Sequence, residues 1–209
     1  MQKPSSTSRG RKIAGLTAAA ILAIFGTVSV YSGLDGRSQV SDALVQEAVV
    51  GTPDMTPSAI AAKAKGAGLQ NVDLPTCSVA GKSVRTGADA RCFAEYMRID
   101  ALTATQGKTY AQMPRFATED GKGTNIESEA LVVDGRPMNN PARNVWVTAT
   151  TLMTALNTSY MAEQVALFGI AVGAMFLLVG LAIAAASVGR VRVPKLARAR
   201  RPIAEGAMS

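Results

Sequence analysis

Few residues of this chain could do chemistry, and histidine is absent from all 209 positions. The usual Ser–His and Cys–His nucleophile pairs need an imidazole as the activating base. The usual catalytic zinc sites and the two-histidine, one-carboxylate iron site need imidazole ligands. Two cysteines are also too few for a Cys₄ zinc site. The composition therefore predicts no catalytic residue, no cofactor and no metal site.

Two other patterns could be taken for chemistry. The acid pairs Glu119/Asp120 and Glu127/Glu129 have the residue types of a glycosidase. They lie in a polar, Gly-rich segment with few aromatic residues to hold a sugar, so we interpret them as a solvated loop. Gly81-Lys82-Ser83 resembles the end of a phosphate-binding loop, but Thr76 stands where that motif requires its first glycine.

The elements that would position any site are dominated by two long uncharged runs, at residues 13–31 and 165–188. A helix needs about 20 apolar residues to cross the hydrocarbon core of a bilayer, and both runs meet that length. The first run is longer than the hydrophobic part of a signal peptide. Ser29-Val30-Tyr31 is also a poor cleavage site, which favours an uncleaved anchor.

The charges at the two ends of the chain predict its orientation. Residues 1–12 and 189–209 hold ten of the 22 Lys and Arg residues but one of the 15 acids. Lys and Arg beside membrane spans are retained in the cytoplasm. We therefore expect a multi-pass protein of the cell membrane with two basic cytoplasmic tails and with residues 32–164 outside the cytoplasm. Nucleic acid is not an expected partner, because the C-terminal tail has no aromatic residue.

Cys77 and Cys92 both lie in the segment expected outside the cytoplasm. Thiols in that compartment meet oxidising conditions, so we predict a disulfide between them. The alternative is a pair of free, partly buried thiols.

The segment between the runs shows helical periodicity for most of its length. Gly33–Gly36 is expected to loosen the first helix, and helical character resumes at 38–50. Thr56-Pro57 predicts a helix start and Gly66 or Gly68 its end. A third helix is expected over 89–105, and residues 117–140 are expected to be mostly loop, with a short strand and turn at 131–135.

The last helix is predicted to run from Asn140-Pro141 through the second apolar run without interruption. Its expected apolar stripe follows helical spacing, and it consists of Val145, Ala149, Leu152, Leu156 and Ser159, with Trp146, Met153 and Tyr160 beside them. The 38–50 segment is the nearest partner for that stripe. The sequence therefore predicts an all-α membrane protein. Its two transmembrane helices extend into an antiparallel extracytoplasmic helical stalk with a small helical cap.

Two features of the second run suggest contacts in the membrane. Gly169 and Gly173 form a GxxxG motif, which lets helices approach closely. It fits a homodimer, another membrane protein partner, or packing of the two spans within one chain. The tail that follows holds six basic residues expected to contact anionic lipids: Arg190, Arg192, Lys195, Arg198, Arg200 and Arg201. The alternative is that these charges act only during insertion.

Several segments resemble a group of small actinobacterial membrane proteins with two spans. They are FAEYMRI at 93–99, GKTYAQMPRF at 107–116, NPAR at 140–143, WVT at 146–148 and ALNTSYMAE at 155–163. Such proteins often carry the label aromatic ring-opening dioxygenase, but ring cleavage of that kind needs histidine ligands to iron, which this chain lacks. The group has no established activity, so the resemblance implies the topology and no mechanism. It directs attention to Tyr110, Arg115, Trp146 and residues 157–160.

Two functions from different classes remain. The first is a non-catalytic envelope scaffold, accessory subunit or binding module. The second is a membrane-bound enzyme with an unrecognised Ser/Lys or carboxylate site. The sequence favours the first, because no candidate catalytic group has an activating partner nearby in the sequence.

Overall fold

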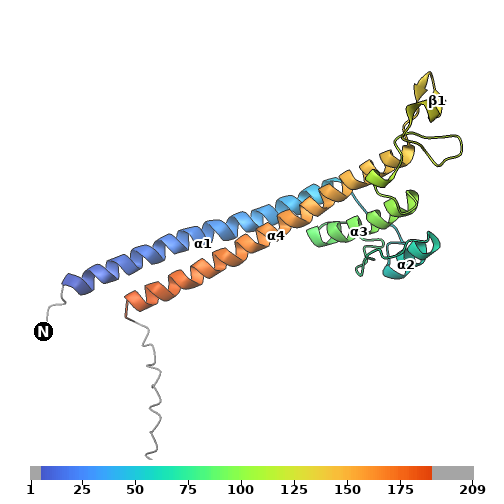
Figure 1. Ribbon diagram of the computed structural model, residues 1–209. Helices are drawn as coiled ribbons and strands as arrows, with labels where there is room; N and C mark the ends of the chain where they lie inside the picture. The colour runs from blue at the N-terminus through green and yellow to red at the C-terminus, as the bar shows by residue number, and fades with distance from the viewer. Residues whose placement is uncertain (1–5, 190–209) are drawn as a thin grey trace, which may run out of the picture. The chain divides into compact units, whose positions relative to one another are not determined.

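The structure is a computed structural model that describes residues 6–189. It is mostly helical, as predicted, with four helices (Figure 1): α1 (Ser6–Gln46), α2 (Pro57–Gly66), α3 (Gly87–Ala104) and α4 (Pro141–Ser187). Between α3 and α4 the chain forms two 3₁₀ turns and a small hairpin: η1 (Tyr110–Gln112), η2 (Glu127–Glu129), β1 (Val132–Val133) and β2 (Arg136–Pro137). The chain divides into two compact units, one of Met1–Val28 with Gly173–Ser209 and the other of Ser29–Val172.

Local signals in the sequence start and stop these elements. The Thr56 hydroxyl accepts a hydrogen bond from the Ala59 N–H at 3.3 Å, and Pro57 occupies the first position of α2. Helix α3 begins two residues before its predicted start, because the Thr86 hydroxyl caps it through the Asp89 N–H at 3.1 Å. The predicted strand and turn are also present, as the β1–β2 hairpin.

In the unit that contains both ends of the chain, α1 and α4 pack closely through small residues. A Cβ atom on Gly26 would lie 2.8 Å from the Gly173 carbonyl oxygen, and one on Gly180 would lie 3.1 Å from that of Ala19. Ala19 and Gly26 are seven residues apart on α1, and Gly173 and Gly180 are seven residues apart on α4, so the two close contacts lie two helical turns from one another. The backbones approach so closely that there is no room for larger side chains.

In the 29–172 unit, the same two helices continue to pack against one another. A Cβ atom on Gly33 would lie 2.6 Å from the Ala166 carbonyl oxygen, and the Ser29 hydroxyl donates to the Gly169 carbonyl at 2.7 Å. The expectation that Gly33–Gly36 loosens the helix is wrong, because α1 continues unbroken to Gln46. Gly33 serves instead to let α1 approach α4.

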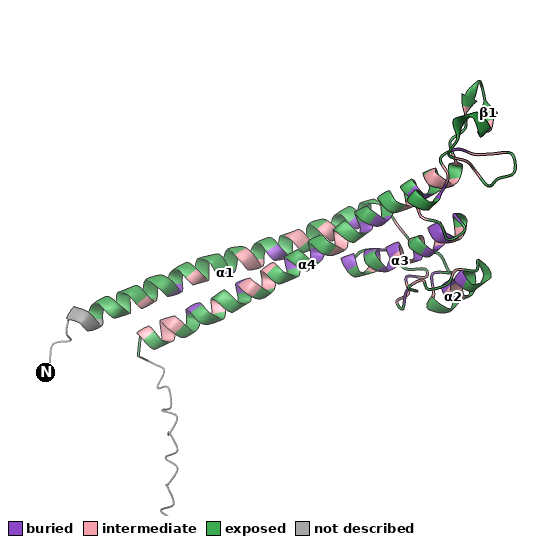
Figure 2. Cartoon of the chain, viewed as in Figure 1, coloured by how far each residue is buried: buried purple, intermediate pink, exposed green. Residues whose placement is uncertain are grey.

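The core of the 29–172 unit is formed where α3 packs against its neighbours (Figure 2). On one side, α2 and the loop before α3 bury Ile60, Val79 and Tyr96. On the other, Leu44 of α1 packs with Met153 and Leu156 of α4, so the expected pairing of these segments is present. The buried side of α4 includes Trp146, Met153 and Leu156.

The predicted apolar stripe on α4 is correct only in part. Leu156 is buried, but Val145 and Leu152 are 45% and 49% exposed. The side of α4 that α3 covers is instead the one with Trp146 and Met153, which are seven residues apart and both pack against residues of α3.

The Cys77–Cys92 disulfide is confirmed. The two Cα atoms are 6.1 Å apart, and the bridge joins the irregular segment before α3 to that helix. The Tyr96 hydroxyl donates to the Cys77 carbonyl oxygen at 2.7 Å, on the same side of α3. Burial, followed by the nearby Glu95 charge, raises the pKa of Tyr96 above its ordinary value of 10.0.

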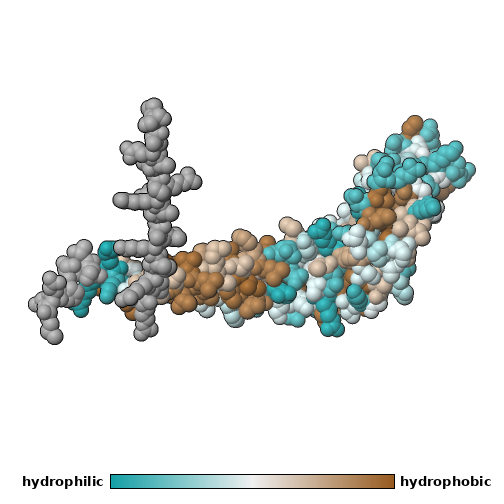
Figure 3. Space-filling view, turned by 90° about the horizontal axis from the view of Figure 1, so that it is seen from below, coloured by the Kyte–Doolittle hydropathy of each residue, from teal (hydrophilic) through white to brown (hydrophobic). Residues whose placement is uncertain are grey.

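Helices α1 and α4 are both long and apolar enough to cross a membrane by length and composition. Large apolar side chains on their outer surfaces are exposed, among them Phe25 at 61% and Phe168 at 70%. Figure 3 shows apolar surface gathered along part of the long helices, and mainly polar surface over the rest.

Candidate functional site

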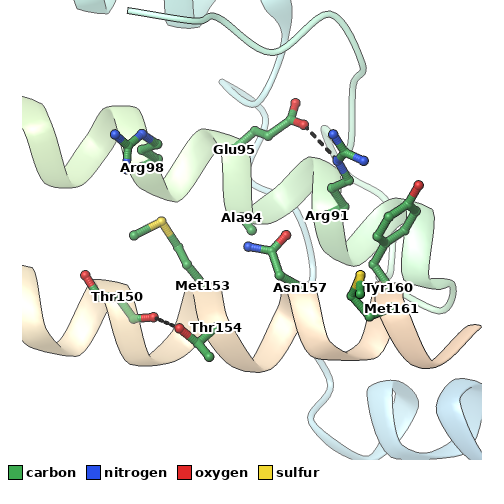
Figure 4. A pocket seen from close by; sticks show the side chains of 10 residues that line it. All are labelled: Arg91, Ala94, Glu95, Arg98, Thr150, Met153, Thr154, Asn157, Tyr160 and Met161. Carbon is green, nitrogen blue, oxygen red and sulfur yellow. Dashed lines mark hydrogen bonds and ion pairs between the residues drawn. The ribbon is translucent and has the colours of Figure 1, made fainter. Parts of the chain in front are cut away.

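Surface depressions of the 29–172 unit border the first half of α4. One depression is lined by several polar side chains from α3 and α4, and we call it the α3–α4 groove (Figure 4). Its volume is about 570 Å³. Its lining from α3 is Arg91, Ala94, Glu95 and Arg98, and its lining from α4 is Thr150, Met153, Thr154, Asn157, Tyr160 and Met161. Two of the residues suggested by the resemblance, Asn157 and Tyr160, therefore face this groove.

The α3–α4 groove has three charged side chains among the described residues, and two of them, Arg91 and Glu95, form an ion pair. Arg91 donates to Glu95 at 3.4 Å and lies 4.9 Å above the centre of the Tyr160 ring. Tyr160 first, and Glu95 second, raise the pKa of the Arg91 guanidinium above its ordinary value. The Thr154 hydroxyl donates to the Thr150 carbonyl, so its proton is held by the helix backbone and not by an activating base. Within the part of the chain that the structure describes, the only ion pair in the groove is the exposed contact of Arg91 with Glu95.

A second, mostly apolar depression of about 580 Å³ lies beside Tyr110, and we call it the Tyr110 groove. Trp146 at this groove is 9% exposed and packs with Leu102 and Met113, while Tyr110 is 43% exposed. Trp146 thus belongs to the core. The remaining lining consists of Val147, Thr150, Thr151, Thr154 and Ala155.

A third depression, which we call the arginine pocket, lies at the start of α4 and has a volume of about 250 Å³. Arg115 comes from the segment after η1, and Arg143 comes from the first turn of α4. The pocket brings together residues that the sequence separates by about 30 positions: Tyr110, Arg115, Asn139, Asn140, Arg143, Asn144 and Val147.

Along these depressions and beyond them, the exposed side of α4 carries almost no charge. Residues 144–189 contain one charged residue, Glu163. Seven of the exposed positions follow alternating steps of three and four residues, and we call them the outer strip: Val147, Thr151, Thr154, Thr158, Met161, Val165 and Phe168. Alternating steps of three and four are the spacing of a helix that packs along another helix.

The threonines of the outer strip are bonded to their own helix through their hydroxyl groups. The hydroxyl groups of Thr151, Thr154 and Thr158 donate to backbone carbonyls four residues earlier, at 2.8–2.9 Å. A hydroxyl bonded to its own helix needs no other partner, so a neighbouring molecule could cover these residues without leaving an unpaired polar group.

Glu163 holds three helices together, and nothing in the sequence pattern indicated this role. It is 8% exposed, accepts the Gly87 N–H at the start of α3 at 2.6 Å, and pairs with Arg37 of α1 at 3.2 Å. A Cβ atom on Gly87 would lie 2.7 Å from the Glu163 carboxylate and from the Tyr160 Cα. The contact therefore requires glycine at that position.

The remaining predicted site residues are the two glycines of the GxxxG motif and the six basic residues of the C-terminal tail. Gly173 lies against Gly26 of α1, and Gly169 lies beside Ser29, so both are placed next to the other long helix of the same chain. The six basic residues of the C-terminal tail, Arg190, Arg192, Lys195, Arg198, Arg200 and Arg201, lie outside the described residues. Within residues 6–189, no three His, Cys, Asp or Glu side chains are grouped closely enough to hold a metal ion.

Comparison of the chain with protein-family models, curated proteins and solved structures finds no match.

Proposed function

We propose that this chain is a two-span membrane protein that acts as a non-catalytic envelope scaffold or accessory subunit. Residues 32–164 would lie outside the cytoplasm as an antiparallel helical stalk with a small cap. The outer strip of α4 would be the surface through which it assembles. The resemblance to small actinobacterial two-span proteins is part of the same proposal.

The exposed apolar residues support the membrane crossing. Val165, Phe168, Leu178 and Leu181 of α4 are each 68–70% exposed, and Ile24 of α1 is 64% exposed. A soluble protein rarely exposes so many large apolar side chains over adjacent turns, because contiguous apolar surface promotes association. A lipid environment accommodates them, since the helix backbone is bonded internally.

The disulfide supports the orientation, because such bonds persist in oxidising compartments outside the cytoplasm. Labelling of intact cells with an impermeant thiol reagent tests it. A cysteine introduced at Gly121 should react, and one introduced at Ser209 should not, because the basic tail is expected inside. Reaction at Ser209 in intact cells would overturn the topology.

The single observation that carries the proposed function is the outer strip. From Val147 to Met161 it lies before the second apolar run, so lipid does not cover it in the proposed topology. A stretch of exposed helix without charge outside the membrane is typical of an interface, because interface cores are depleted of charged residues. We infer that another helix lies along it.

A second copy of α4 is the occupant that this strip fits best. Two copies inserted in the same membrane are parallel and bring the same residues to the same height. The strip has no charges, so two copies meet without repulsion, and its spacing suits a pair of helices crossing at about 20°. Each strip would then bury the other.

Disulfide cross-linking tests this arrangement in the full chain. Single cysteines introduced at Thr151, Thr154 and Thr158 should each give a covalent dimer under mild oxidation, and one at Ala162 should give less. Asp42→Cys is the matched control, because it is also exposed but lies on α1. Equal cross-linking of the control, or none along the strip, contradicts the proposal. Cross-linking to a different protein alone would replace the second copy with that partner.

The basic C-terminal tail is the proposed contact with anionic lipids. Each Lys or Arg near an anionic leaflet contributes about 1 kcal/mol to binding. A peptide of residues 190–203 should bind anionic vesicles strongly and neutral vesicles weakly, and added salt should reduce the binding. Binding that is independent of lipid charge would leave topology as the sole role of the tail.

A further inference from the structure

The walls of the arginine pocket are held in place by the backbone. The Arg115 carbonyl accepts the Asn140 N–H at 3.0 Å, and the Pro114 carbonyl accepts the Asn140 side-chain amide at 3.1 Å. The Asn140 side-chain oxygen also caps α4 by accepting the Ala142 N–H at 3.0 Å. The segment that carries Arg115 is thereby fixed beside the first turn of α4, so the pocket exists without a ligand.

The pocket is positively charged and contains no acid. Arg115 and Arg143 line it together with three asparagines, and none of the four ion pairs within residues 9–189 involves either arginine. The start of α4 adds a partial positive charge from the helix dipole. The pocket therefore lacks the counter-charge that two neighbouring guanidinium groups would normally have.

Arg143 is the group that most clearly lacks a partner. Its guanidinium lies 3.9 Å above the centre of the Tyr110 ring, which fixes its position by a cation–π contact. Its Nε atom is buried and has no hydrogen-bond partner within the described chain. A buried donor without an acceptor is unfavourable, because it has lost its bond to water. Because that atom is closed to solvent, a ligand with oxygen acceptors would bind the terminal nitrogens of the same guanidinium.

We propose that the arginine pocket binds a phosphate monoester. Arginine presents a planar set of donors that matches phosphate oxygens, and two of them balance the roughly two negative charges of a phosphate monoester at neutral pH. The side-chain amides of Asn139 and Asn144 supply further donors at the rim. A volume of about 250 Å³ leaves room for part of the group that carries the phosphate.

The source of the phosphate is a soluble molecule, not a phospholipid of the same membrane. The pocket lies at the start of α4, 24 residues before Val165, which is ~36 Å along a helix. This point rests on the proposed topology, whereas the pocket itself does not depend on it.

Calorimetric titration of the full-length protein in neutral-lipid nanodiscs tests the proposal, with glycerol 1-phosphate as the probe. We expect saturable binding at one site, and weaker binding of glycerate, in which a singly charged carboxylate replaces the whole CH₂–O–phosphate group. Arg115→Gln and Arg143→Gln should each weaken binding about tenfold or more, because each removes charge-assisted hydrogen bonds. Arg98→Gln is the matched control, since Arg98 is an exposed arginine outside the pocket. Each variant is first checked for helix content and for the Cys77–Cys92 bond.

Absence of saturable binding would overturn the proposal, as would binding that survives both pocket substitutions or is lost equally in Arg98→Gln. Binding to phosphatidic acid vesicles through Arg115 and Arg143, without binding of glycerol 1-phosphate, would overturn the assignment of the source. Neither arginine belongs to the outer strip, so failure here leaves the cross-linking result along α4 unaffected, and the two proposals fail separately.

Discussion

Replacing Glu163 with alanine would remove the contact that joins α1, α3 and α4. The Gly87 N–H would then be buried without an acceptor, and Arg37 would lose its partner. A buried donor without an acceptor costs ~1–3 kcal/mol. The Arg37 side chain is 44% exposed, so its ion pair adds only ~0–1 kcal/mol after screening by solvent. We therefore expect the free energy of unfolding of the 29–172 unit to fall by ~1–4 kcal/mol.

Urea unfolding in nanodiscs, followed by fluorescence, measures that change. Trp146 is the only tryptophan in the chain and is buried against α3, so its emission reports undocking of that helix. Glu163→Gln should cost less, because the amide oxygen can still accept the Gly87 N–H. Glu95→Gln is the control: it breaks an exposed pair with Arg91, and such a pair contributes less than about 0.5 kcal/mol.

Amide hydrogen exchange gives a local measurement of the same contact. The Gly87 N–H should exchange at least about tenfold faster in the alanine variant, since it loses its acceptor. If Glu163→Ala unfolds at the same urea concentration as Glu95→Gln, or if Gly87 exchange is unchanged, the assigned role of Glu163 is wrong.

Two further substitutions and one titration test other parts of the structure. Replacing Cys77 and Cys92 together with serine should lower the free energy of unfolding by about 3 kcal/mol, because the bridge closes a loop of about 15 residues; an unchanged urea midpoint would contradict this. Gly33→Leu should destabilise the 29–172 unit by ~1–3 kcal/mol through overpacking against α4, measured by the same unfolding curve. The Thr118 hydroxyl holds the pKa of Asp120 below 3.8, so the stabilising effect of its carboxylate is present above that pH and is lost as pH falls through the lowered pKa. An NMR titration of Asp120 should give a midpoint below 3.8, and a midpoint at or above it would refute the assignment.

Local chemistry in the sequence determined most of the helices and their limits. Thr56 before Pro57 begins α2, and Asn140 before Pro141 begins α4, because a cap depends only on residues within one turn. The two uncharged runs predicted the long apolar helices for a similar reason, since length and composition are properties of one segment. The disulfide could be predicted because the chain has only two cysteines.

Only the tertiary structure decided what the remaining residues do. Gly33 resembled a helix breaker in the sequence, yet its role is set by the α4 backbone, more than 130 residues away. Glu163 joins Gly87 and Arg37, which lie 76 and 126 residues from it. Contacts at such separations leave no periodic or local signal, because the two partners share a location only after the helices have packed. The arginine pocket has the same origin: Arg115 and Arg143 are ordinary charged residues in the sequence, and the backbone bonds around Asn140 bring them to one cavity.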